Sequence, residues 1–158
     1  MTVSTSAQEL RHRIRTGEHA GHTSGYAPGH VQCNLMILPE DWAMEFMGFC
    51  QKNPKPCPLV DVSPSPGDPG FTRLGKDIDV RSDIPGYRVF EHGEEVTTVA
   101  DISDFWRDDL VAFAIGCSFS FEEALLVDGL EIRNLTEDKN VPMYRTNIAC
   151  APSGRLHG

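Results

Sequence analysis

The residues with the clearest chemical potential lie in a short turn, Gly116-Cys117-Ser118, between two apolar stretches. The apolar run of residues 110–115 ends at this turn, and Ser120 with Glu123 matches a capping box at the start of a helix. A helix N-terminus presents unpaired N–H groups and a partial positive charge, which stabilise a carboxylate, a phosphate or an oxyanion. The hydroxyls of Ser118 and Ser120 add donors there. Cys117 then has two interpretations: a thiol whose thiolate the helix start stabilises, or a small hydrophobe in the core.

Three cationic side chains are candidates for binding an anion. Arg145 lies beside Asn147 in a polar stretch, and a guanidinium binds a carboxylate through two parallel hydrogen bonds. Arg107 and Lys55 are further candidates, although either can equally pair with Asp108 or another neighbouring acid. The prolines around Lys55 restrict the backbone, which fits a rigid loop that holds a cation and fits a plain connection equally well.

Two amides interrupt the apolar stretch of residues 31–38, which has the length of a buried or edge strand. They are Gln32 and Asn34, and because strand side chains alternate, both are expected on one face. They are either ordinary hydrogen-bonded amides or groups that orient the carboxylate or amine of a substrate.

The elements that must position these residues alternate between helical and extended patterns. Ser6 and Pro39 mark helix starts, and Trp42, Phe46 and Phe49 recur at a spacing that predicts an apolar helix face in the core. Helices are predicted over residues 7–15, 39–51, 103–106 and 120–129, and strands over residues 31–38, 59–62, 87–90, 96–99, 110–115 and 131–134. The alternation favours an α/β fold, a mixed sheet with flanking helices.

Composition narrows the function. The 14 basic and 23 acidic residues give a net charge of −9, without the basic stripe of a nucleic-acid-binding protein. No apolar run approaches the roughly 18 residues of a membrane span, and the N-terminus lacks the apolar core of a secretory signal, so we expect a cytoplasmic protein. The five cysteines are odd in number and irregularly spaced, which favours reduced thiols over disulfides or zinc. The four histidines between residues 12 and 30 are expected in a solvated loop rather than in a metal site.

Several long stretches resemble one family, the hydro-lyases related to mitochondrial D-glutamate cyclase. They are GYAPGHVQCNLMILP (25–39), FCQKNPKPCPLVDV (49–62), GDPG (67–70), DFWRDDLVAFAIGCSFSFEEAL (104–125) and NVPMYRTNIAC (140–150). The resemblance implies a lyase that reversibly removes water from D-glutamate to give 5-oxo-D-proline, with no metal or organic cofactor. Family members are longer, which implies an incomplete copy of a larger two-subdomain α/β fold. We therefore expect an N-terminal helix and polar loop (1–24), followed by a cyclase-like domain (25–158).

The implied chemistry assigns roles to the candidate residues. Arg145 is expected to bind the α-carboxylate, and the groups of residues 118–120 the oxyanion, while Asp61 or Asp108 is the candidate base. Cys117 is expected to position or pack rather than to attack the substrate.

We expect the chain to bind a small carboxylate or amino acid, and to bind neither nucleic acid nor a membrane. The formation of a homo-oligomer is left open. Two alternatives remain: a non-catalytic module that binds a small anion, and a subunit that a partner chain completes.

Overall fold

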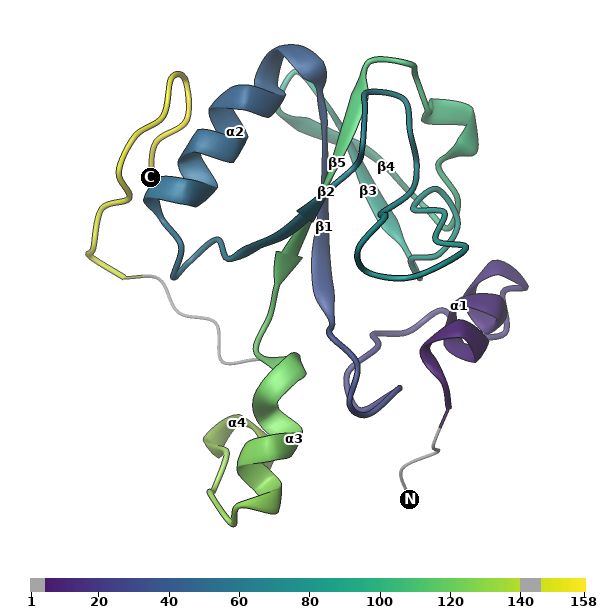
Figure 1. Ribbon diagram of the computed structural model, residues 1–158, viewed down its shortest axis with the longest axis vertical. Helices are drawn as coiled ribbons and strands as arrows, with labels where there is room; N and C mark the ends of the chain where they lie inside the picture. Colours follow the sequence, from purple (N-terminus) through teal and green to yellow (C-terminus); the bar gives the residue numbers. More distant parts are fainter. Residues whose placement is uncertain (1–4, 140–145) are drawn as a thin grey trace.

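The computed structural model describes residues 5–139 and 146–158, and it confirms an α/β fold in which helices flank the sheet structure (Figure 1). The larger sheet has the strand order β1-β5-β2, and both outer strands run antiparallel to β5. A second sheet consists of β3 and β4. In chain order the elements are α1 (Ala7–Arg15), β1 (Cys33–Pro39), α2 (Glu40–Lys52), β2 (Leu59–Val62), β3 (Tyr87–Glu91), β4 (Glu94–Val99), the 3-10 turn η1 (Ser103–Phe105), β5 (Leu110–Gly116), α3 (Phe119–Val127) and α4 (Arg133–Thr136).

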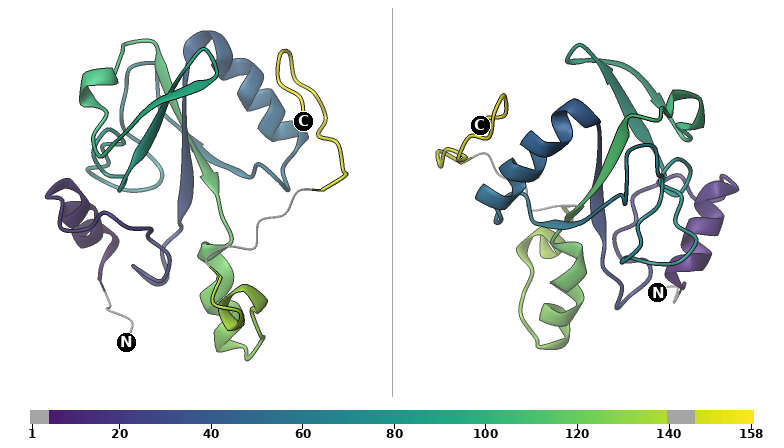
Figure 2. Two further views of the ribbon diagram at one scale, coloured as in Figure 1. Left: turned by 180° about the vertical axis from the view of Figure 1, so that it is seen from behind. Right: turned by 45° about the horizontal axis from the view of Figure 1, so that its top comes forward.

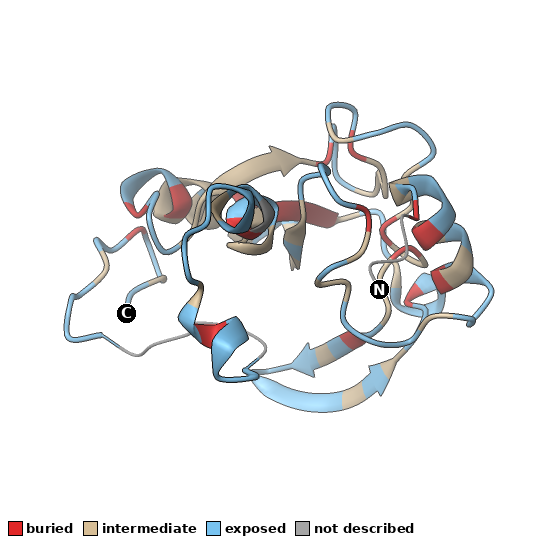
Figure 3. Cartoon of the chain, turned by 90° about the horizontal axis from the view of Figure 1, so that it is seen from below, coloured by how far each residue is buried: buried red, intermediate tan, exposed pale blue. Residues whose placement is uncertain are grey.

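Strand β5 lies at the centre of the core, as its unbroken apolar sequence predicts. Its residues 110–114 are all buried (Figure 3). On one face Ala112 packs against Phe71 and Val80, which belong to the long segment between β2 and β3. On the other face Phe113 packs against α2, and its ring meets that of Phe46 edge-on with the centroids 4.9 Å apart. Both faces of β5 are therefore covered.

Helix α2 covers its face of the larger sheet with Ala43, Phe46 and Met47. Trp42, which the sequence predicts in the same core stripe, lies instead under the guanidinium of Arg155, whose central carbon is 3.6 Å from the ring centroid. The apolar stripe is thus only partly directed at the core. The C-terminal segment of the chain runs along the outer side of α2 (Figure 2).

Asn53, directly after α2, fixes this C-terminal segment. Its amide nitrogen donates to the carbonyls of Phe49 at 2.8 Å and Ala151 at 2.9 Å, and its oxygen accepts the N–H of Ala151 at 2.8 Å. A buried asparagine with both ends bonded resembles a backbone pairing, so it ties the two segments together without a strand.

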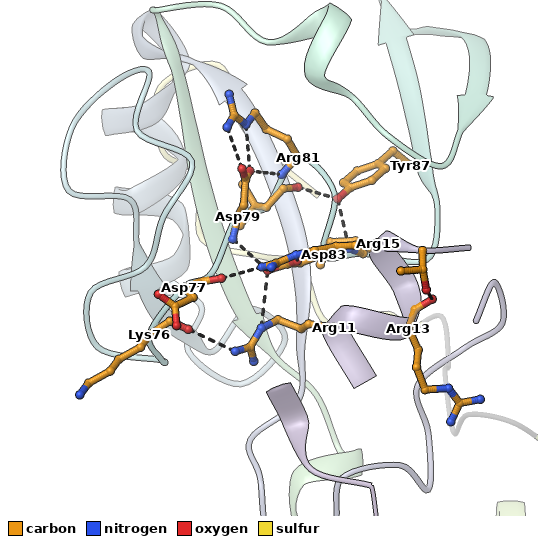
Figure 4. A network of polar contacts seen from close by, with 12 residues as sticks. Arg11, Arg13, Arg15, Lys76, Asp77, Asp79, Arg81, Asp83 and Tyr87 are labelled. Atoms are coloured by element: carbon orange, nitrogen blue, oxygen red, sulfur yellow. Dashed lines mark hydrogen bonds and ion pairs between the residues drawn. The ribbon is translucent and has the colours of Figure 1, made fainter. Parts of the chain in front are cut away.

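Helix α1 begins as predicted, because the Ser6 hydroxyl accepts a first-turn N–H at 3.1 Å. A charged cluster holds α1 to the segment before β3 (Figure 4). Arg15 donates to both carboxylate oxygens of Asp83, and Arg11 Nε lies 3.6 Å from the same carboxylate. Asp83 also accepts the N–H of Asp79 at 2.8 Å, and its side chain is only 2% exposed. The cluster therefore joins the first helix to the rest of the chain.

The predicted hairpin is confirmed as β3 and β4. Its connection is His92-Gly93, with φ of 50° and 87°. Two successive residues with positive φ are typical of the tight turns that match the twist of paired strands.

Two local predictions are wrong. Residues 131–134, expected as a strand, lead into the short helix α4, because local hydrogen bonds such as that from the Thr136 N–H to the Ile132 carbonyl form there and no described strand pairs with them. The helix expected over residues 103–106 is only the single turn η1, with Ile102 as its N-cap residue, and the Asp101 carboxylate accepts the Ser103 N–H at 2.7 Å.

Helices α3 and α4 extend away from the larger sheet (Figures 1 and 2). Large apolar side chains of α3 and of the connection to α4 are exposed in the described part of the chain, including Phe121, Leu126, Leu130 and Val127, which is 81% exposed. A helix with apolar residues on several sides is usually covered on several sides, so this pair of helices presents an apolar surface.

Candidate active site

The candidate site lies at the carboxyl end of β5, where Gly116-Cys117-Ser118 turns the chain into α3. The Gly116 N–H donates to the Pro58 carbonyl at 2.9 Å, which ties the turn to the residues before β2. A Cβ at position 116 would lie 3.3 Å from Val60 Cγ2. Glycine therefore permits the close approach of β2 at this point.

Helix α3 begins at Phe119, with Ser118 as its N-cap residue and no side-chain hydrogen bond to its cap. Ser120 lies inside the helix, so the predicted capping box of Ser120 with Glu123 is wrong. The side chain of Glu123 lies outside the described residues. The helix N-terminus is nonetheless at the end of the central strand, as the sequence predicts.

The thiol of Cys117 is half-buried at this helix start and donates to the Gln32 carbonyl at 3.4 Å. Burial raises its pKa, and this effect outweighs the N–H groups of Phe119 and Ser120, which favour the thiolate; the nearby Glu122 raises the pKa further. The raised pKa argues against the first interpretation of Cys117, a thiolate stabilised by the helix start. The alternative, a packed or positioning thiol, fits the structure.

Cys33 lies close to this thiol, and Asp61 lies close to Cys33. Cys33 pairs with Gly116 across the sheet. Its pKa is raised to about 11, mainly by burial and to a smaller extent by the proximity of Cys117 and Asp61. Asp61 in β2 accepts the N–H of Val62 at 3.0 Å and, through its other oxygen, the N–H of Arg73 at 3.3 Å. The structure thus brings Asp61 near the turn, as a carboxylate whose two oxygens each accept a backbone hydrogen bond.

Ser120 connects α3 to the segment before β1. Its hydroxyl accepts the Gln32 N–H at 2.9 Å and donates to the Gln32 carbonyl at 3.2 Å, so both functions of the hydroxyl are occupied. The side-chain amide of Gln32 donates to the Tyr26 carbonyl at 3.1 Å and accepts from the Thr23 hydroxyl at 3.2 Å. Gln32 is therefore an ordinary hydrogen-bonded amide, one of its two interpretations.

Ser118 forms a pair with a residue that the sequence did not single out. Its hydroxyl donates to Glu122 Oε1 at 2.9 Å, and Glu122 is only 8% exposed. The two residues are four apart, a spacing that places them on one face of a helix. The spacing of four residues was the signal in the sequence that could have predicted this pair. It points to a site only when Glu122 is also known to be buried.

Other predicted site residues lie elsewhere. Asp108 precedes β5 at the opposite end of the strand, and the seven residues of β5 alone span about 20 Å at the usual rise per residue. Arg107 forms an ion pair with Asp109 at 2.9 Å, which is the alternative interpretation of Arg107. Lys55 is exposed in the loop after α2, and Asn34 is exposed on the edge strand β1. Asn34 nevertheless lies next to the turn, because it pairs with Ile115 of β5, directly before Gly116.

The predicted anion clamp is only partly described. Arg145 lies outside the described residues, and Asn147 is exposed in a stretch without helix or strand. The assignment of Arg145 to a substrate carboxylate stays a prediction.

A shallow surface hollow beside α1 shares no residue with the turn. Among its lining residues are Arg11, Arg15 and Asp77, and both arginines already bind Asp83 or backbone carbonyls. Among the described residues we find no cluster of three metal-ligating side chains suited to a metal ion. No described helix is both long and apolar enough to cross a membrane.

The fold and the turn define an α/β domain with a helix N-terminus, a buried hydroxyl–carboxylate pair and neutral thiols at the end of its central strand. Residues 111–158 match the model of the D-glutamate cyclase family. The chain is 60% identical over 149 residues to a protein of Pseudomonas aeruginosa named putative hydro-lyase, covering 94% of the chain. Proteins with the same name from Bordetella petrii and Aliivibrio salmonicida are 57% and 52% identical, over 98% and 100% of the chain. These matches confirm the resemblance to the hydro-lyase family related to D-glutamate cyclase.

The matched relatives are longer than this chain. The chain spans 56% of the length of the Pseudomonas relative, 58% of the Bordetella relative and 60% of the Aliivibrio relative. The activity of the relatives therefore transfers to this chain only as a proposal.

Proposed function

We propose that this chain carries part of a hydro-lyase of the D-glutamate cyclase type, which reversibly converts D-glutamate to 5-oxo-D-proline and water. The family match and the names of the relatives support hydro-lyase chemistry. The turn at the end of β5 supports a site for a reaction in which negative charge develops on oxygen.

The reaction forms one C–N bond and breaks one C–O bond. The amino nitrogen attacks the γ-carboxyl carbon, and an oxyanion forms on a tetrahedral intermediate. Two protons leave the ammonium nitrogen overall and depart with one carboxyl oxygen as water. The site must therefore accept protons from nitrogen, return them to oxygen and stabilise the oxyanion. Because the ring closes within one molecule, holding the folded conformer contributes much of the rate.

The observation that carries the proposal is the position of the α3 N-terminus, which begins at Phe119 beside the Cys117 thiol at the end of β5. The N–H groups of Phe119 and Ser120 lower the pKa of this thiol, although burial outweighs them. The Phe119 N–H at this helix start would stabilise an oxyanion beside the sulfur, whereas the Ser120 N–H also donates to the Cys117 carbonyl at 3.4 Å. On this proposal Cys117 positions the substrate, Arg145 binds its α-carboxylate, and Asp61 is the base suggested by the sequence.

A time course of proton NMR spectra tests the proposal, with the purified chain and, in separate samples, D-glutamate, 5-oxo-D-proline and L-glutamate. Interconversion of the D pair alone would support it. A folded chain that converts neither D compound would refute it for this chain.

A second candidate, a module that binds a small carboxylate without turnover, is favoured by one observation. Both oxygens of Asp61, the candidate base, already accept backbone N–H groups, which leaves fewer of its lone pairs for a substrate. Calorimetric binding of D-glutamate without any change in its NMR spectrum would select this candidate.

A further inference from the structure

The Ser118 hydroxyl has a single proton, and that proton is engaged. It points to Glu122 Oε1 at 2.9 Å, and an ionised carboxylate only accepts hydrogen bonds. Ser118 therefore cannot donate the same proton to an oxyanion. Its free lone pairs can accept a proton or a hydrogen bond from a ligand. This reverses the role that the sequence suggested for the hydroxyl.

Glu122 is an unusual carboxylate for this chain. It is nine-tenths buried in the first turn of α3, and in the described part of the chain it forms no ion pair with a cation. A buried carboxylate without a cation is costly unless hydrogen bonds or an incoming positive charge compensate it. The bond from Ser118 compensates it only in part, since a carboxylate has about four acceptor positions.

The other acceptors near the turn are less available. Each oxygen of Asp61 already accepts a backbone N–H, and the Ser120 hydroxyl is used in both directions by Gln32. The hydroxyl of Ser118 differs from these groups. Its oxygen can still accept a hydrogen bond, and its proton is bonded to the Glu122 carboxylate.

We propose that Ser118 and Glu122 form a pair that receives the amino group of the substrate, with Glu122 as a positioning residue that acts through Ser118. The inference rests on the proposed function and deepens it, since it specifies a ligand with an ammonium group next to carboxylates. The hydroxyl oxygen of Ser118 accepts an N–H of the ligand, and the negative charge of Glu122 favours the ammonium ion.

The pair then takes the role of base that the sequence suggested for Asp61, and it completes the proton balance of the reaction. One ammonium proton passes to Ser118 Oγ as the Ser118 proton passes to Glu122, which leaves a neutral amine able to attack. The proton held on Glu122 returns through Ser118 to the carboxyl oxygen that departs. The second nitrogen proton follows the same route as the C–O bond breaks, so both protons leave in the water.

A binding experiment tests the pair independently of turnover. The ligands are D-glutamate and glutarate, which has the same two carboxylates and no amino group, and the method is isothermal titration calorimetry. We expect the wild-type chain to bind D-glutamate at least tenfold more tightly than glutarate, and Glu122→Gln to lose this preference while it keeps its affinity for glutarate. A wild-type chain that does not distinguish the two ligands, or that binds neither, would overturn the inference.

A kinetic experiment with the same variants tests the proton transfer. Glu122→Gln and Ser118→Ala should each lower kcat by about 10²-fold or more, with a smaller change in KM, as expected for a lost acid–base path. Ser118→Thr retains a hydroxyl and should recover most of kcat. The matched control is Glu131→Gln, which alters an exposed glutamate just after α3. Circular dichroism melts verify that each variant is folded.

The two experiments separate the possible failures. A folded wild-type chain that prefers D-glutamate through Glu122 but does not convert it would refute the proposed function and leave the amine-binding pair standing. Turnover that is unchanged in folded Glu122→Gln would overturn the pair and leave the proposed function standing.

Discussion

The charged cluster between α1 and the segment before β3 makes a quantitative prediction for Asp83→Asn. The substitution removes a negative charge whose side chain is 2% exposed and which two arginines approach. Asparagine has nearly the same shape, so the change acts on charge and hydrogen bonding rather than on packing. We expect a clear loss of stability and a loosening of α1.

The magnitude follows from the geometry. Removing one partner of a buried ion pair costs about 3–5 kcal/mol, because the other charge stays buried without compensation. The Arg15 side chain is 37% exposed, so water can solvate its guanidinium when Asp83 is lost. Asparagine also keeps one oxygen that can accept the Asp79 N–H. The expected loss is therefore smaller, about 2–3 kcal/mol in the free energy of unfolding.

Urea unfolding followed by circular dichroism measures this loss. At a typical urea dependence, the midpoint of Asp83→Asn should fall by about 1–2 M. Hydrogen exchange should show that the amides of α1 lose protection before those of the larger sheet. The matched control is Glu137→Gln, which breaks the exposed pair with Arg133 in α4 and should leave the midpoint unchanged.

A midpoint for Asp83→Asn equal to that of the control would refute the reasoning. It would mean that the desolvation of Asp83 cancels the attraction of its arginines, and that α1 is held by its apolar contacts alone.

Three further changes have defined outcomes. Tyr87→Phe removes a hydroxyl that donates to the Val80 carbonyl at 2.6 Å, so thermal melts should show a loss of about 1–2 kcal/mol, and unchanged melts would contradict this. Arg81 lowers the pKa of Asp79 below its ordinary 3.8, so the stability from this pair is present above that value and is lost as the pH falls through the depressed pKa. Urea midpoints measured from pH 6 to pH 2.5 should therefore fall less steeply in Asp79→Asn, and parallel curves would argue against the pair. The pKa of Cys33 is about 11, so iodoacetamide at pH 8 should alkylate this thiol more slowly in the folded chain than in the same chain in urea. Peptide mass spectrometry measures both rates, and equal rates would show that the thiol is not buried.

Features that depend on local sequence patterns were predictable. The strand around Phe113 follows from an apolar run between turn signals, and the hairpin at Gly93 follows from strand patterns on both sides of a glycine turn. Ser6 and the first helix follow from capping. The turn after Gly116 was located for the same reason, since a glycine ends one pattern and a helical pattern follows.

Features that depend on distant segments were not predictable. Trp42 follows the helical period of α2, but Arg155 near the end of the chain covers it. The sequence could not show that Ser120 bonds Gln32, which removes Ser120 from the candidate hydroxyls and leaves Ser118. Asp108 was a candidate base because of its residue type, but β5 separates it from the turn. In each case the tertiary arrangement decides between alternatives that the residue types leave open.

The order β1-β5-β2 has a consequence for how the chain acquires its structure. In the described chain both outer strands of the larger sheet pair with β5, which follows them in the sequence by dozens of residues. During synthesis, β1, α2 and β2 therefore emerge before their common partner, β5. Their apolar faces and strand edges stay exposed until residues 110–116 have been synthesised. Contacts between such distant segments slow folding, because a long loop must close before any pairing is gained. The larger sheet can form only after β5 has been synthesised. A nascent chain that stops before β5 leaves β1 and β2 unpaired, and other chains can then pair with them.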